Sequence, residues 1–435
     1  MRHASSRQPD RRRAQWAWAL TSWANHAFLT TVVVGLFPIF FDKYWAAALP
    51  GTTSTFYLGL TNSSASFAIM LLAPTLGALA DRRGQKKLWF GIFTAVGVLA
   101  TLLLALTGRN QWIFALLMFG LGSLGFWGGY AFQDALITQV AEPRESNRIS
   151  AFGFALGYLG GGLLFLVNVL LVLHPAWFGL HGATAAMRVA FLDVAAWWLL
   201  FSLPLFRYVP EAQATAARTG LRELAATMRS VLRDRPVLRF LLAYWLYIDG
   251  INTLQVMAVD FGTKLGFATS ALIQALLLVQ FVAFPCALLF GRLGDRIGAK
   301  RAIYLGLAVF VGVTVYGYFM RSETQFYVLA VIVGTVQGGV QALSRSYFTR
   351  LIPRERSGEY FGFYNMLAKF AAVLGPAAMG LVALLSGNQR LSVLVLIVFF
   401  VAGGVLLARV REGDRRIAWI DASRSSGETP VPPAL

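Results

Sequence analysis

Long apolar runs recur along almost the whole chain, and they constrain its fold more than any other feature. Each is close to the ~20 residues that a helix needs to cross the hydrocarbon of a bilayer. They lack the strict alternation of barrel strands, and lipid offers no partner to an unpaired backbone group. The sequence therefore predicts an all-α membrane protein with twelve transmembrane helices. The expected spans are 17–41, 54–79, 88–107, 112–138, 149–173, 188–208, 236–262, 269–292, 301–320, 325–349, 359–386 and 391–409.

Composition excludes the main soluble alternatives. Hydrophobic residues make up 57% of the 435 residues and charged residues 13%, too few to cover the surfaces of soluble domains. The single cysteine, Cys286, allows no intrachain disulfide and no cysteine metal cluster. The sequence contains no ATP-binding motif, no catalytic triad and no metal-ligand spacing. We expect no enzyme, no cofactor and no metal.

The net charge of +18 is distributed in a way that predicts topology. Lys and Arg cluster at both termini, in the even-numbered loops and in the polar stretch 209–235, whereas the odd-numbered loops carry single cations. The positive-inside rule then places both termini and the central stretch in the cytoplasm. Because topology accounts for the charge, no nucleic-acid partner is expected.

These spans and loops predict five segments. They are a basic N-terminus (1–16), a six-helix half (17–208), a linker (209–235), a second six-helix half (236–409) and a C-terminal tail (410–435). Apolar residues of the linker recur at helical spacing, which favours an amphipathic helix on the inner leaflet. A solvated tether is the alternative.

A loop motif occurs twice at an offset of 214 residues, near half the chain. The first copy contains Gly77, Asp81, Arg82 and Gly84, and the second contains Gly291, Asp295, Arg296 and Gly298. The glycines permit close helix approach and a tight turn. Each aspartate lies at a helix end, where it can accept bonds from N–H groups or pair with arginines of the other half. We predict two halves in parallel repeat, with these loops as conformational switches.

The doubled loop is similar to the signature of the major facilitator superfamily. More narrowly, the chain resembles the "unknown major facilitator" branch, which includes the autophagy-type vacuolar effluxer. Segments 22–28, 155–162, 249–253, 337–346, 361–364 and 369–371 carry this resemblance. Ser22 departs from it, because the branch usually has an acid before the first-span tryptophan, and His26 stands where a small residue is common. The resemblance implies solute transport, with amino-acid efflux as the best-known activity.

Ionisable residues inside spans are costly in lipid and therefore mark candidate sites. Asp249, on a face with Asn252, and Lys369, one turn after Asn365, lie at similar depths in spans 7 and 11. We predict that Asp249 and Lys369 pair. Two roles remain open, a static ion pair or a site for binding substrate.

A second predicted pair joins Asp134 in span 4, beside Gln133, to Arg345 in span 10. Gln337 and Gln341 share the face of Arg345. In the superfamily arrangement spans 1, 4, 7 and 10 line the central cavity, so this pair is a candidate cytoplasmic gate. Local packing is the alternative.

The first span carries a polar stripe of Ser22, Asn25, His26 and Thr30, which we expect to line the cavity. His26 is a candidate for a coupling proton, because its charge changes near neutral pH, or else a neutral hydrogen-bonding residue. Tryptophans near span ends are expected to be interfacial anchors, and the glycines at 160–162 to allow close helix packing. The anchor candidates are Trp16, Trp18, Trp45, Trp197 and Trp198.

Taken together, these patterns favour a secondary active transporter in the cell membrane. It would move an amino acid or small organic ion by alternating access, with coupling to protons as one option. The predicted partners are the lipid bilayer, the solute and protons, and the protein is expected to be a monomer. A non-transporting receptor or scaffold on the same fold is the alternative.

Overall fold

A computed structural model describes residues 8–49, 51–211, 214, 229 and 233–410. Its first half begins with one long helical stretch that contains two π-helical parts. Those elements are α1 (Gln8–Ala27), η1 (Phe28–Leu36), α2 (Phe37–Phe40) and η2 (Phe41–Trp45). The half continues with α3 (Gly51–Arg83), α4 (Lys86–Leu106), α5 (Trp112–Val140), α6 (Ser146–Leu173), η3 (Pro175–Phe178) and α7 (Ala183–Tyr208).

The second half of the described chain is again made of long helices. It comprises α9 (Arg235–Lys264), α10 (Thr269–Ile297), α11 (Ala299–Phe319), α12 (Glu323–Leu351), η4 (Arg354–Arg356), α13 (Ser357–Ser386), α14 (Gln389–Leu394) and α15 (Leu396–Ala408). The last expected span is thus divided into α14 and α15, which meet at Val395. Most of the predicted linker helix and the tail beyond residue 410 lie outside the described residues.

Ten of the described helices are long and apolar enough to cross a membrane. Two further long helical stretches are α9 and the stretch that begins with α1. With these two, the described helices match the set of spans that the sequence leads us to expect. The protein is a multi-pass, all-helical membrane protein, and the twelve-span topology remains a prediction. The first helix begins at Gln8, nine residues before the expected start of its span.

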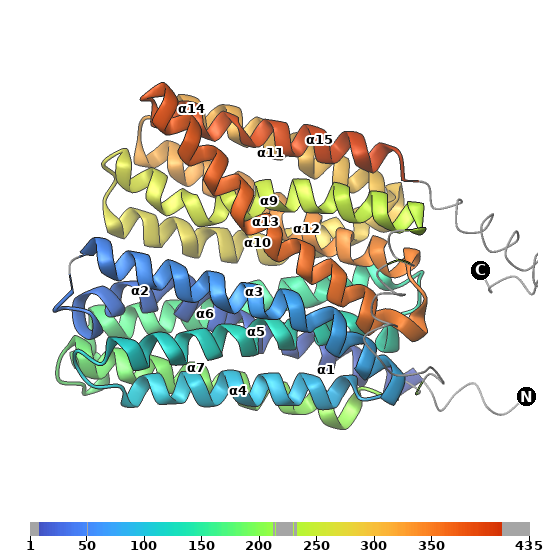
Figure 1. Cartoon of the computed structure of the whole chain (residues 1–435), viewed down its shortest axis with the longest axis horizontal. Coiled ribbons are helices and arrows are strands. Elements are labelled where there is room, and N and C mark those ends of the chain that lie inside the picture. The colour runs from blue at the N-terminus through green and yellow to red at the C-terminus, as the bar shows by residue number, and fades with distance from the viewer. Residues whose placement is uncertain (1–7, 50, 212–213, 215–228, 230–232, 411–435) are drawn as a thin grey trace, which may run out of the picture.

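Figure 1 shows the two halves as neighbouring groups of roughly parallel helices, blue to green and yellow to red. α13 crosses from the second group toward α3 of the first. The described chain begins with α1 and ends with α15 at the same end of the bundle, which we call the base. Between the halves, α3 packs on α13 and α6 packs on α10 and α12.

Glycines let α6 lie very close to its neighbours, as expected. A Cβ added to Gly160 would meet the Trp23 ring at 2.6 Å, and one added to Gly161 would meet the Thr30 hydroxyl at 2.9 Å. Such distances leave no room for a larger residue. The polar stripe of the first helix is therefore pressed against α6.

The prediction that these tryptophans are interfacial anchors was partly wrong. Trp16 is exposed, but Trp18, Trp45 and Trp198 are buried inside the first half. Trp18 donates its indole N–H to the carbonyl of Gln133 at 2.8 Å. A position near a span end does not say which way the ring points, and these rings turn inward, where they fill large volumes in the core.

Candidate functional site

Arg345 and Asp134 form a buried ion pair between the halves, as predicted. The guanidinium Nη1 of Arg345 lies 2.8 Å from Asp134 Oδ1, and both side chains are 1% exposed. Asp134 lies six residues before the end of α5, and Arg345 lies six residues before the end of α12. At 1.5 Å per residue the pair is ~9 Å inside the base.

Residues that the sequence analysis did not assign to this site complete the surroundings of Arg345. Its Nε donates to the Ser150 hydroxyl and its Nη2 to the Ser150 carbonyl, both at 2.9 Å. The guanidinium lies over the rings of Trp18 and Phe154, 4.9 and 4.4 Å from their centroids. Arg345 therefore ties α12 to three helices of the other half.

The carboxylate of Asp134 and its neighbour Gln133 are also well bonded. Asn365 of α13 donates to Asp134 Oδ2 at 3.2 Å. Gln133 accepts from Asn25 at 2.7 Å and donates to the Ser22 hydroxyl. Part of the polar stripe on the first helix thus forms bonds inside its own half, where the sequence analysis expected it to line a cavity.

The predicted pair of Asp249 and Lys369 does not form. Asp249 Oδ1 accepts from the backbone N–H of Gly375 at 3.1 Å and from the Thr253 hydroxyl at 3.2 Å. Gly375 lies six residues beyond Lys369 on α13, or ~9 Å along the helix. Lys369 Nζ instead lies 2.6 Å from the ring centroid of Trp127, on α5 of the other half. In the described part of the chain, no carboxylate lies within ion-pair distance of Lys369.

Other candidate residues line the seam between the halves further from the base. His26 Nδ1 lies 3.0 Å from the Ser22 carbonyl and its ring faces Tyr158, whose hydroxyl accepts from Gln337. Thr30 accepts from Gln280 of α10 at 2.9 Å. Asn252 and Gln341 are half-buried. The seam therefore links α10 to the first helical stretch through Thr30, and α12 to α6 through Tyr158.

The first motif loop docks on the other half at the base. Asp81 accepts from the backbone N–H groups of Gly358 and Glu359, at 3.0 and 2.8 Å. These are among the first N–H groups of α13, which have no partner within their helix, so Asp81 acts as an anionic cap. Lys86, fully buried, lies 2.7 Å from Asp81 and donates to the Ser357 hydroxyl. The sequence analysis treated Lys86 only as a topology signal.

Glycines make this docking possible. A Cβ on Gly77 would lie 2.2 Å from the Gly358 carbonyl oxygen. Gly84 has a φ of 61°, in the left-handed region that favours glycine. Arg82 lies in the last turn of α3, beside this glycine. The first loop therefore brings the end of α3 into direct contact with the start of α13.

The second motif loop makes the equivalent contact in a more open form. Asp295 is exposed and accepts one bond, from Asn147 of α6, at 3.0 Å. Gly291 packs against Ala151, and Gly298 has a φ of 88°. Arg296 is exposed. Both loops thus meet the opposite half at the base, with unequal burial.

Comparison with known proteins agrees with this architecture. A model of the family described as "Vacuole effluxer Atg22 like" matches residues 137–416. An uncharacterized MFS-type transporter of Bacillus subtilis (strain 168), YxiO, is 37% identical over 405 residues, 91% of this chain and 94% of that protein. This chain belongs to the Atg22-like family. Within the major facilitator superfamily, it is a membrane transporter.

Fungal members of the Atg22-like family are more distant. Autophagy-related protein 22 of Yarrowia lipolytica is 26% identical over 63% of this chain, which spans about half (52%) of that protein's length. Solved structures share the fold. The human organic anion transporter MFSD10 superposes with a TM-score of 0.75 at 16% identity, over 92% of this chain and all (100%) of that one. The proton:xylose symporter XylE gives 0.69 at 14% identity, over 93% and 96%.

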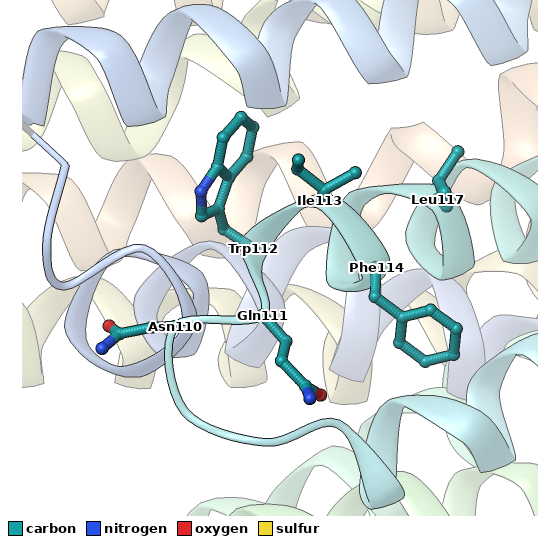
Figure 2. Close-up of a pocket in the computed structure, with 6 residues that line it drawn as sticks. All are labelled: Asn110, Gln111, Trp112, Ile113, Phe114 and Leu117. Atoms are coloured by element: carbon teal, nitrogen blue, oxygen red, sulfur yellow. The ribbon is translucent and has the colours of Figure 1, made fainter.

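A surface hollow of this Atg22-like protein lies away from the polar seam. It has a volume of about 610 Å³ and lies at the start of α5, at the end of the bundle away from the base. Figure 2 shows its lining of Asn110, Gln111, Trp112, Ile113, Phe114 and Leu117. The apolar members are mostly exposed on a helix that crosses the membrane, so lipid chains are its natural contents.

Proposed function

We propose that this protein is a secondary active transporter that moves a small solute across the cell membrane by alternating access. One observation carries the proposal: the polar contacts that bridge the halves gather from the base to the middle of the bundle. Such contacts hold one end closed and can separate when the halves rock about a central site. The base is the cytoplasmic side in this proposal, with two six-helix halves and both termini inside. The location in the cell membrane is proposed from the Bacillus relative.

The solute is proposed to be an amino acid or small organic ion that carries a carboxylate. Arg345 is occupied by Asp134 and Ser150, so it is poorly suited to bind a solute in this state. Lys369 is half-buried at the seam and contacts an aromatic ring of the other half. A carboxylate bound to Lys369 would compensate its charge and touch both halves at once.

A disulfide across the base tests alternating access. The hydroxyls of Ser146 and Ser346 lie 2.7 Å apart, on α6 and α12. In a Cys286→Ala background, Ser146→Cys with Ser346→Cys should form a disulfide on oxidation. Solute flux into liposomes should then stop, and reduction should restore it. Each single cysteine variant, oxidised in the same way, is the control. Full flux through the cross-linked protein would contradict rocking of the halves.

The same liposomes distinguish transport from the receptor or scaffold alternative. Candidate amino acids and organic anions are first screened by the rise in Tm that they cause, because a ligand of the folded state stabilises it. Each stabilising compound is then offered to the liposomes. Binding without flux for every such compound would favour a receptor.

Proton coupling is a further proposal, with Asp249, Asp134 or His26 as the group that takes the proton. Asp134 is bonded at both oxygens, whereas His26 uses Nδ1 toward Ser22 and keeps Nε2 for a proton. An imposed pH gradient should drive flux in the wild type. Asp249→Asn and His26→Gln then show which group responds, and flux that ignores the gradient in all variants would remove proton coupling.

A further inference from the structure

Asp249 lies at a joint between α9 and α13 that resembles an incomplete ion shell. Its Oδ1 accepts from the N–H of Gly375 and from the Thr253 hydroxyl. Its Oδ2 is buried and accepts no hydrogen bond from the described residues. Asp249 and Thr253 are each 1% exposed. A buried carboxylate with a free oxygen is costly at this depth unless a positive species approaches it.

No side chain in the described structure supplies that positive charge. α9 packs against α13, α15 and α12. The charged groups that those helices carry within the membrane are Lys369, which lies over Trp127, and Arg345, which is held by Asp134. Asp249 takes part in none of the described ion pairs.

The chain brings further oxygen atoms to the same place. Pro376, inside α13, has no N–H, so the backbone carbonyl of residue 372 lacks its usual helical donor. That carbonyl lies within one turn of Gly375. The Thr253 hydroxyl donates its hydrogen to Asp249 and keeps its lone pairs for another partner. A carboxylate, a hydroxyl and a freed carbonyl are oxygen ligands of the kind that hard cations prefer.

Gly375 shows that the joint depends on close approach. A Cβ at this position would lie 1.9 Å from the Thr253 hydroxyl and 2.8 Å from Asp249 Oδ1. Any larger residue would force α9 and α13 apart. The glycine therefore allows both oxygen-bearing side chains to lie against α13 next to Pro376.

We propose that Asp249, Thr253 and the segment of α13 at Gly375 and Pro376 bind a sodium ion. One carboxylate balances one monovalent charge, whereas a divalent ion would leave a net charge in a medium of low dielectric constant. Backbone carbonyls that lack a helical donor can coordinate such ions in membrane proteins. The coupling role of the ion rests on the transport function proposed above, but its binding does not.

Sodium binding is measured on the purified full-length protein without solute. The Tm should rise as NaCl replaces choline chloride at constant ionic strength, and radioactive sodium should bind saturably. Asp249→Asn and Thr253→Val should lose both responses, and Thr253→Ser should keep them because it retains the hydroxyl. Gly375→Ala should lose them, and Gly380→Ala on the same helix, with nothing within 4 Å of its added Cβ, should not.

Other outcomes of these measurements distinguish the sodium site from its alternatives. A Tm that ignores sodium, a sodium response that survives both Asp249→Asn and Thr253→Val, or a response to pH alone would overturn it. The last of these would identify a proton on Asp249 instead. Flux that proceeds equally with and without sodium would contradict the coupling role of the ion, whereas the binding site and the transport function would both stand. Sodium binding that needs Asp249, in liposomes that move no solute, would support the site and contradict transport.

Discussion

The sequence analysis paired two sets of opposite charges between the helices of this protein, and the fold treats these two sets differently. Arg345 and Asp134 meet in an ion pair whose remaining polar atoms are bonded to serine and asparagine. Asp249 and Lys369 stay apart, the one beside Gly375 of α13 and the other over a tryptophan. The first set is complete within the protein, which fits the proposed role of holding the base closed. The second leaves both charges without a charged partner among the described residues, which is the condition of a site that awaits ligands.

The largest expected effect comes from removing one partner of the complete pair. Arg345→Met should lower the free energy of unfolding by about 3–5 kcal/mol, because it leaves Asp134 buried and unpaired. The measurement is the Tm of the protein in detergent. Arg345→Lys keeps the charge but cannot reach Asp134 and Ser150 together, so it should recover only part of the loss. Wild-type stability in Arg345→Met would show that the complete pair contributes no more to the free energy of unfolding than the unpaired charges do.

Substitution in the incomplete set should lower the affinity for ligand without lowering the stability of the protein. Lys369→Gln removes a half-buried cation that has no carboxylate partner in the described structure, so the Tm should hold or rise. Affinity for a carboxylate-bearing solute should fall by about 10- to 100-fold, the worth of a hydrogen bond to a charged group. Lys369→Arg is the matched control that keeps the charge. A large loss of Tm in Lys369→Gln would mean that Lys369 has a structural role.

A smaller effect is expected at the base, from the two motif loops. Asp81→Asn weakens a buried cap of α13 and its bond to Lys86, so it should cost about 1–2 kcal/mol and favour opening of the base. Asp295→Asn, exposed and singly bonded, should stay within about 0.5 kcal/mol of wild type. Labelling of a Ser357→Cys variant from the cytoplasmic side, in a Cys286→Ala background, reports the opening. Equal labelling in the two variants would contradict the asymmetry of the loops.

These differences mark where sequence reasoning reaches its limit. Depth along a helix can be counted from the sequence, which is why Asp134 and Arg345 were correctly paired. The same count failed for Asp249 and Lys369, because α13 crosses the bundle toward α3 and its tilt places Gly375 beside Asp249. Tilt and rotation depend on packing, which a pattern of apolar residues does not encode.

The motif loops show the same division. Their glycines and aspartates predicted a helix-end contact with the other half, and Asp81 makes one. The sequence does not say that the contact is with the start of α13, nor that Lys86 turns inward to join it. Such a burial is recognised only when the partner helix is in place, because an arginine- and lysine-rich loop is equally consistent with exposed cations.

Replacing the complete pair as a unit is expected to change stability much less than Arg345→Met does. Asp134→Leu with Arg345→Met removes both charges and fills the site with apolar side chains, so the unfolding free energy should lie within about 1 kcal/mol of wild type. The two single losses should therefore not add, since the residues share one contact. Flux should nevertheless change, because the closed base loses a contact that must form and break in each cycle. The Tm of the two single variants and the double variant gives the coupling energy, and liposome flux gives the gating effect. Normal flux in the double variant would show that the pair only packs the helices, and that other contacts at the base, such as that of Asp81 with the start of α13, hold it closed.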